Sequence, residues 1–174
     1  EFQYCGSIAP WPLESNSRAV LEEIGRTLVA EFQLQGLFGA DFILDGTDVW
    51  PVEVNPRYTA SIEMIELAHG LQAIDWHLST CTTTGLPRLP ALGEQSTATC
   101  LGKVIWFAKR PLVISELTSS WALAQRDLSD IPVPGTKINI GEPVLTIHAE
   151  SWTLDETLAT LHEWMHDLES RFNQ

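Results

Sequence analysis

Two strand-like segments joined by a short Asp-Gly turn constrain the fold of this chain more than any other feature. The runs GADFILD (residues 39–45) and DVWPVEVN (residues 48–55) are rich in apolar residues, and Asp45-Gly46-Thr47-Asp48 connects them. Asp-Gly between two apolar runs is a strong signal for a β-hairpin. The sequence therefore predicts an antiparallel pair of strands over residues 39–55.

Helical periodicity flanks this hairpin on both sides. Apolar residues recur at helical spacing over residues 17–32, where Ser15, Asn16 and Ser17 offer N-cap candidates. After Pro56 the pattern predicts a helix over residues 60–69 that stops at Gly70, and another over residues 74–80.

The second half of the chain predicts a smaller, β-rich module. Residues 83–99 are rich in Gly, Pro, Thr and Ser, and we place a domain boundary there, with domains at 1–90 and 91–174. KVIWFA (103–108) predicts a strand, and DIPVPGTKINIGEPVLTIHAE (130–150) predicts short antiparallel strands. An apolar stripe over residues 154–172 predicts a closing helix. The expected class is α+β, an antiparallel sheet with flanking helices followed by the β-rich module and this helix.

Composition argues against two classes of partner. The chain of 174 residues carries a formal net charge of −13. Binding to nucleic-acid phosphates or to an anionic membrane surface depends on surplus Lys and Arg, so we expect neither partner. No apolar run approaches the roughly 20 residues of a membrane span.

The cysteines and the first residue suggest the cellular setting and the extent of the chain. Cys5, Cys81 and Cys100 are widely spaced and form no CxxC, which favours a reducing, cytoplasmic location over a disulfide framework. The chain starts at Glu1, without a methionine, inside a strand-like run. We therefore expect that an N-terminal part of the same protein is missing, and part of a site with it.

Polar residues of the two strands are expected to converge. Pairing the strands across a three-residue loop at positions 46–48 sets Asp41 opposite Glu53, and the strand period of two puts Asn55 on the same face as Glu53. The register depends on the loop length, because a slip of one residue would break the convergence. The opposite face is expected to point toward a core through Phe42, Leu44, Val52 and Val54.

Two carboxylates and a carboxamide oxygen form a hard-oxygen donor set. Such a set suits Mg²⁺ better than zinc, and Mg²⁺ takes one or two carboxylates and leaves its other positions to water and phosphate. Arg57 follows next to the start of the helix predicted at residue 60, where free N–H groups favour anions. Ser61, on the first helical turn, could touch substrate or phosphate, or serve as a cap. The alternative is a solvated polar hairpin face with Arg57 as a surface ion-pair partner.

The run GLFGADFILDGTDVWPVEVNPRYTASIE (36–63) resembles the metal-binding hairpin of the ATP-grasp superfamily. The resemblance covers about residues 1–80 and implies that Asp41, Glu53 and Asn55 hold Mg²⁺ (or Mn²⁺) on the phosphates of ATP. It also implies that Arg57 contacts the transferred phosphate or an acyl phosphate. Within the superfamily, the likeness is to a branch without an assigned activity.

The resemblance implies an ATP-dependent ligase. ATP would phosphorylate a small-molecule carboxylate, and an amine or a thiol would displace the phosphate. The family's glycine-rich loop and its nucleotide-binding lysines lie upstream of the hairpin, in the expected missing part. Residues 130–150 resemble the small β-rich C-terminal module of several ATP-grasp carboxylases and ligases.

Two other functions stay open. The first is a non-catalytic module, derived from an ATP-grasp domain and kept for binding. The second is a zinc hydrolase, because His162-Glu163-Trp164-Met165-His166 matches HExxH. Only eight residues follow His166, so a third zinc ligand would have to lie upstream, and the apolar stripe already accounts for the helix.

Overall fold

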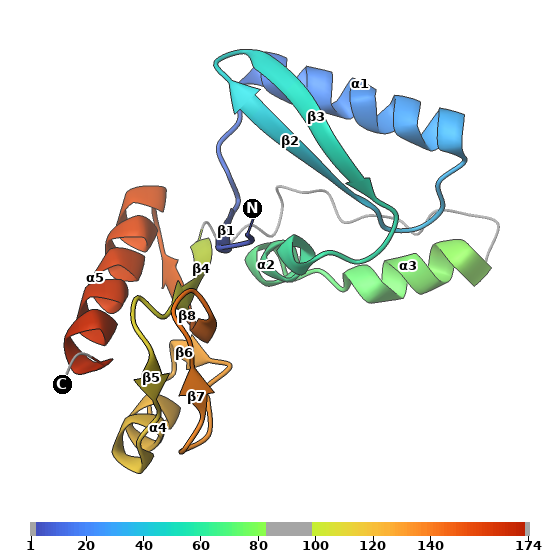
Figure 1. The fold of residues 1–174 in the computed structure, drawn as a ribbon. Helices are drawn as coiled ribbons and strands as arrows, with labels where there is room; N and C mark the ends of the chain where they lie inside the picture. Colours follow the sequence, from blue (N-terminus) through green and yellow to red (C-terminus); the bar gives the residue numbers. More distant parts are fainter. Residues whose placement is uncertain (1–2, 83–98, 173–174) are drawn as a thin grey trace. The chain divides into compact units, whose positions relative to one another are not determined.

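The computed structural model describes residues 3–82 and 99–172 and shows helices interspersed with antiparallel strands (Figure 1). All strand pairs in these residues are antiparallel, which confirms the predicted α+β class. The elements are β1 (Gly6–Ala9), α1 (Ser15–Phe32), β2 (Gly39–Asp45), β3 (Asp48–Asn55), α2 (Ala60–His69), α3 (Ala73–Thr82), β4 (Cys100–Phe107), β5 (Leu112–Val113), α4 (Glu116–Leu123), β6 (Leu128–Ser129), β7 (Lys137–Ile138), β8 (Pro143–Ser151) and α5 (Leu154–Phe172).

Tertiary contacts divide the chain into two compact units. The hairpin unit is Pro10–Thr97, and the sheet unit combines Glu1–Ala9 with Ala98–Gln174. The first strand, β1, therefore pairs with β4 from the second half of the sequence. The domain division at residues 90 and 91 stays a prediction, because it falls within 83–98, outside the described residues.

In the hairpin unit, α1 lies along the β2–β3 hairpin (Figure 1). The helix begins two residues before its predicted start, and its apolar residues Leu21, Ile24 and Leu28 are half-buried. After Phe32 the chain turns at Gln33, which adopts a left-handed conformation with φ 50°. The periodicity thus predicted the helix, but its apolar face is covered only in part, because Val20, Val29 and Phe32 are exposed.

The two helices after the hairpin follow from their end signals. Helix α2 has the predicted bounds, and Gly70 ends it with φ 62° and a backbone N–H donated to the Glu66 carbonyl. A left-handed residue at this position favours glycine, which has no Cβ to clash. Helix α3 is slightly longer than predicted, and His77 Nδ1 accepts the backbone N–H of Leu37 at 3.0 Å, which ties α3 to the segment before β2.

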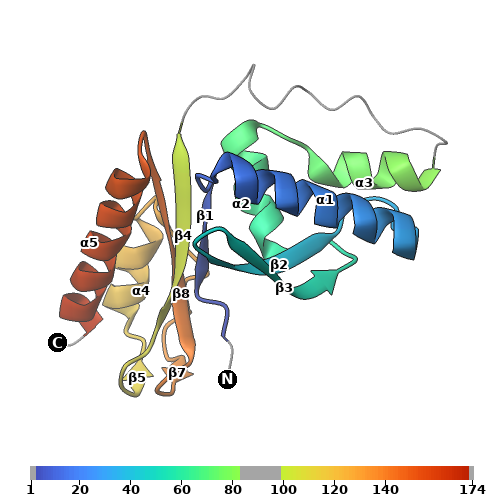
Figure 2. The ribbon, with the colours of Figure 1, turned by 90° about the horizontal axis from the view of Figure 1, so that it is seen from above.

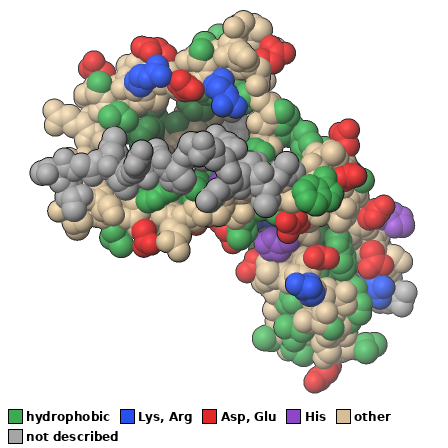
Figure 3. Space-filling view, turned by 180° about the vertical axis from the view of Figure 1, so that it is seen from behind, with side chains coloured by type: hydrophobic (Ala, Val, Ile, Leu, Met, Phe, Trp, Pro, Cys, Tyr) green, Lys and Arg blue, Asp and Glu red, His purple; other side chains and the backbone are tan. Residues whose placement is uncertain are grey.

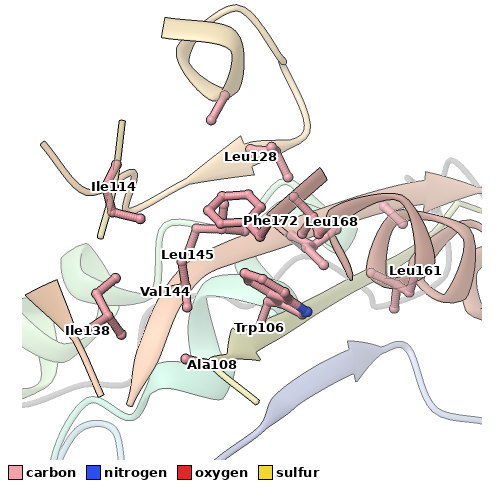
Figure 4. Packing of buried hydrophobic residues seen from close by; sticks show 13 residues of the cluster. Trp106, Ala108, Ile114, Leu128, Ile138, Val144, Leu145, Leu161, Leu168 and Phe172 are labelled. Atoms are coloured by element: carbon pink, nitrogen blue, oxygen red, sulfur yellow. The ribbon is translucent and has the colours of Figure 1, made fainter. Parts of the chain in front are cut away.

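The sheet unit is built on a four-stranded sheet of order β1-β4-β8-β6. Helix α5, which has the predicted bounds, packs along β4 and β8 (Figure 2). Gly102 permits this close approach, because a Cβ at this position would lie 2.8 Å from side-chain atoms of both Leu161 and Thr157. Figure 4 shows the core between sheet and helix, where the rings of Trp106 and Phe172 lie 4.8 Å apart.

Three short elements of the sheet unit were not predicted. They are the strands β5 and β6 and the helix α4. Ser115 caps α4, since its Oγ accepts the backbone N–H of Thr118 at 3.0 Å. A serine followed by Glu116 is a recognisable start signal, so this helix was predictable from the sequence.

The surface agrees with an acidic chain. Acidic side chains are scattered over the face shown in Figure 3, as expected from the net charge of −13. None of the helices in the described part of the chain combines the length and hydropathy that a membrane span requires.

Candidate metal and phosphate site

The hairpin turn is one residue shorter than predicted. Asp45 pairs with Asp48, so the loop consists of Gly46 and Thr47 alone, and the prediction of a three-residue loop is wrong. Gly46 has φ 60°, a value that the tight turns of two-residue hairpins require. With this turn alone, Asp41 would face Val52.

A β-bulge restores the predicted pairing. The register shifts between Asp41 and Phe42: Phe42 pairs with Pro51, Asp41 pairs with Glu53, and Val52 is the extra residue of β3. Pro51 lies directly before this extra residue, and a proline suits a strand at a bulge because it has no N–H to donate to the ladder. The predicted opposition of Asp41 and Glu53 is therefore confirmed, although the route to it differs.

The polar residues share one face of the hairpin. Asn55 pairs with Gly39, and alternation along β2 places Gly39 on the same side as Asp41. Asp41, Glu53 and Asn55 thus lie on one face, as predicted. The prediction of a core on the other face is mostly wrong: Phe42 is half-buried, but Leu44, Val52 and Val54 are all exposed, Val52 to 61%. Val52 lies in the bulge, where it has no partner across the ladder.

The two carboxylates form an uncompensated pair. Asp41 and Glu53 are exposed and directly opposed, and within the described residues neither side chain has a hydrogen-bond or ion-pair partner. Like charges directly opposite on a ladder are destabilising. A bound cation removes this repulsion, so the donor chemistry fits a metal ion.

Asn55 is the buried member of the site. Its side chain is 9% exposed, and its Oδ1 accepts a hydrogen bond from Arg57 Nη2 at 3.2 Å. The backbone N–H of Arg57 also donates to the Asn55 carbonyl at 2.8 Å, which closes a three-residue turn over Pro56. A carboxamide oxygen has two lone pairs, so Oδ1 keeps one acceptor position besides the contact with Arg57.

Arg57 itself is exposed and held at two points. Besides the contact with Asn55, Arg57 Nη1 donates to the backbone carbonyl of Tyr58 at 3.1 Å. The guanidinium keeps further N–H donors free of these two contacts, since it carries five. It can therefore bind an anion beside the carboxylate pair without leaving its position.

Ser61 lies on the first turn of α2, as predicted, but it does not cap the helix. Thr59 is the N-cap residue, and no side chain there accepts a backbone N–H. The Ser61 hydroxyl lies 3.0 Å from the Thr59 hydroxyl and is exposed. Contact of Ser61 with a phosphate or substrate stays a prediction.

Tyr58 and Glu66 were not predicted as site residues. The Tyr58 hydroxyl donates to Glu66 Oε2 at 2.7 Å, and Glu66 Oε1 accepts the backbone N–H of Ala73 at 2.6 Å. The hydrogen bond to Glu66, burial, and the negative charges of Glu66 and Glu63 raise the pKa of Tyr58 to about 12. A helical glutamate eight residues after a tyrosine gives no sequence signal, because the turn between them sets the contact.

Comparison with known proteins agrees with this geometry. The family model described as ATP-grasp domain matches residues 1–61, which include the hairpin and the start of α2. Residues 1–61 are thus similar to the ATP-grasp domain. The predicted superfamily is therefore confirmed, and the ATP-grasp segment contains all five predicted site residues: Asp41, Glu53, Asn55, Arg57 and Ser61.

Relatives extend the likeness over nearly the whole chain. Uncharacterized protein MJ0776 of Methanocaldococcus jannaschii is 24% identical over 170 residues, covering 97% of this chain and 39% of its own length. L-amino acid ligase from Bacillus licheniformis has a TM-score of 0.72 at 17% identity, over 94% of this chain and 43% of the ligase. N5-carboxyaminoimidazole ribonucleotide synthetase from Thermotoga maritima has a TM-score of 0.62 at 17% identity, over 91% of this chain and 44% of the synthetase.

These likenesses show that the chain shares its fold with the two solved structures. It spans less than half the length of each of these three relatives. At 17% identity, the two solved structures show a shared fold and nothing about substrate.

The HExxH sequence gains no support from the structure. His162 and His166 are exposed on α5, the helix that packs on the sheet through its apolar stripe. Within the described residues, no group of three or more His, Cys, Asp or Glu side chains could hold a metal ion. The hairpin site differs from such a group because it combines two carboxylates with an amide oxygen.

Proposed function

We propose that the protein carrying this chain is an ATP-dependent ligase that joins a carboxylate to an amine or a thiol through an acyl phosphate. The observation that supports this proposal best is the opposition of Asp41 and Glu53 across the ATP-grasp hairpin, next to Asn55. Mg²⁺, or Mn²⁺ in its place, and the phosphates of ATP are assigned to this face.

The hairpin residues have distinct roles in this proposal. Asp41, Glu53 and the Oδ1 of Asn55 are the metal ligands. A bound Mg²⁺ supplies charge neutralisation for the phosphates of ATP. Asp41 and Glu53 keep their opposed positions through the strand ladder, so no rearrangement of the backbone is needed before the metal binds.

Arg57 is the proposed catalytic residue. Its guanidinium, fixed by Asn55 and Tyr58, stabilises negative charge on the transferred phosphoryl group and on the acyl phosphate. Preorganised donors of this kind act without reorganisation at the moment of reaction. Ser61 is placed as a further contact to phosphate or substrate, on the exposed first turn of α2.

Amino acids are the first substrates to test. The relative with the TM-score of 0.72 is named as an L-amino acid ligase, and such a substrate offers both a carboxylate and an amine. The three widely spaced cysteines support a cytoplasmic location for the reaction. We assign the activity to the whole protein, because the relatives are more than twice as long as the part of them that this chain matches.

Release of ADP tests the proposal. Full-length protein is incubated with Mg-ATP and a panel of L-amino acids and other carboxylates, with and without amines and thiols. We expect one combination to stimulate ADP release, and Asp41→Ala or Glu53→Ala to abolish nearly all of it. Near-normal release in both variants contradicts the metal assignment, and no nucleotide binding at all favours a non-catalytic ATP-grasp module.

A further inference from the structure

A continuous set of hydrogen bonds joins the start of α3 to the proposed metal site. The backbone N–H of Ala73 donates to Glu66 Oε1 at 2.6 Å, and the Tyr58 hydroxyl donates to Glu66 Oε2 at 2.7 Å. The Tyr58 carbonyl accepts from Arg57 Nη1 at 3.1 Å, and Arg57 Nη2 donates to Asn55 Oδ1 at 3.2 Å. All five residues lie in the hairpin unit.

We propose that Tyr58 and Glu66 are positioning residues that hold the guanidinium of Arg57 where it can contact the transferred phosphoryl group. This inference rests on the proposed function, because it takes Arg57 as the group that stabilises the transferred phosphoryl. Neither Tyr58 nor Glu66 touches the reacting atoms in this account. They act through the Tyr58 carbonyl, on which the guanidinium rests.

The two ends of Tyr58 explain why it transmits position. Its hydroxyl is fixed by Glu66, and its carbonyl fixes Arg57, so a movement of Tyr58 moves the acceptor of the guanidinium. Arg57 is an exposed side chain with several rotatable bonds, and in the described residues its hydrogen bonds are those with Asn55 and Tyr58. A displaced catalytic group loses rate even when the substrate still binds.

The link between Glu66 and Ala73 fixes the other end of the chain. Glu66 Oε1 satisfies a free backbone N–H at the start of α3, so the carboxylate is held by a helix terminus. This contact alone would make Glu66 a purely structural connector between α2 and α3. The second oxygen, turned toward Tyr58, is the part of Glu66 that the positioning role requires.

The variant Tyr58→Phe separates the two roles. It removes the hydroxyl and leaves the contact between Glu66 and Ala73 intact. Glu66→Gln keeps an oxygen acceptor for Ala73 and offers the Tyr58 hydroxyl an N–H donor, so it should rescue most of the function that Glu66→Ala loses. Tyr4→Phe is the matched control, because Tyr4 is the other tyrosine of the chain and its hydroxyl contacts Ser7, in the sheet unit.

The first measurement needs no nucleotide. Exchange of the Arg57 backbone N–H, which donates to the Asn55 carbonyl, is followed by NMR in the full-length protein. We expect Tyr58→Phe to accelerate this exchange at least about 10-fold and to leave exchange in α1 unchanged. The reason is that loss of the hydrogen bond between Tyr58 and Glu66 lets the turn around Arg57 open locally. Equal exchange rates in Tyr58→Phe, Tyr4→Phe and the unmodified protein would overturn the proposal.

The second measurement is a double-mutant cycle on Mg-ATP turnover. We expect Tyr58→Phe to lower kcat about 10-fold with little change in the KM for Mg-ATP, and Arg57→Ala with Tyr58→Phe to equal Arg57→Ala alone. Independent, additive losses would overturn the positioning role. Absence of Mg-dependent nucleotide binding by the unmodified protein would instead count against the proposed function. The exchange measurement would then still show whether Tyr58 and Glu66 hold Arg57 in position.

Discussion

Asp41 and Glu53 face each other across the β2–β3 ladder, and the unpaired Val52 is the residue that keeps them in register. The two-residue turn alone would set Asp41 against Val52, an apolar residue. The bulge therefore creates a pair of opposed carboxylates. We expect their repulsion to lower the stability of the metal-free protein and a bound cation to offset this loss.

Asp41→Asn should change stability in opposite directions without and with the metal. Removing one of two opposed charges should raise the free energy of unfolding of the metal-free protein by about 0.2–1 kcal/mol. The same substitution should abolish the added stability that Mg²⁺ gives to the unmodified protein, because a neutral amide is a weaker ligand. Thermal unfolding with and without Mg²⁺ measures both effects.

Asp45→Asn is the control for this substitution. Asp45 and Asp48 are also opposed acids, at the tip of the same hairpin and without a neighbouring buried amide. We expect Asp45→Asn to raise the free energy of unfolding by a similar amount and to keep the added stability that Mg²⁺ gives. Loss of the Mg²⁺ effect in both variants would show that the ion acts on the hairpin charge in general.

Gly102→Ala should destabilise the sheet unit. The added methyl group would lie 2.8 Å from side-chain atoms of Leu161 and Thr157, so α5 would have to move away from β4. Overpacking of this kind costs about 1–3 kcal/mol in the free energy of unfolding. Denaturant unfolding followed by circular dichroism measures the loss.

Gly25→Ala provides the matched comparison. Gly25 lies within α1, and a Cβ at this position would have no atom within 4 Å apart from the neighbouring residues and backbone of its own helix. In a helix, alanine is more stable than glycine by roughly 0.5–1 kcal/mol, so this substitution should stabilise the chain. Equal effects from the two substitutions would contradict the packing account of Gly102.

Tyr58 should ionise at an unusually high pH. Its pKa is raised to about 12, first by the hydrogen bond to Glu66. A raised folded pKa means that the contribution to stability is fully present below the pKa of an unfolded tyrosine, about 10, and is lost as the pH rises through about 12. The difference in ultraviolet absorbance between the unmodified protein and Tyr58→Phe isolates this titration. Ionisation of Tyr58 near pH 10 would contradict the contact with Glu66.

Local signals explain why several elements were predicted with the right bounds. Helix α2 ends where Gly70 provides a left-handed residue, and α5 follows its apolar stripe to Phe172. Such signals depend on neighbouring residues and are visible in one sequence. The short helix α4 carries a comparable signal in Ser115, which caps its first turn.

The site itself was predicted in part for the wrong reason. The pairing of Asp41 with Glu53 was expected from a longer loop, whereas the structure combines a shorter turn with a bulge. Pro51 was the available clue, because a proline within a strand often marks a bulge. The sequence gives no signal for the contact between Tyr58 and Glu66, because its geometry arises from the turn that connects β3 to α2.

Calorimetric titration of the full-length protein with Mg-ATP tests the central claim most directly. The account predicts Mg²⁺-dependent binding that weakens at least about 10-fold in Asp41→Asn and in Glu53→Gln, by analogy with the loss of groups around a metal site. Asp45→Asn should bind as the unmodified protein does. Unchanged affinity in both Asp41→Asn and Glu53→Gln would contradict the assignment of the metal and phosphates to this hairpin.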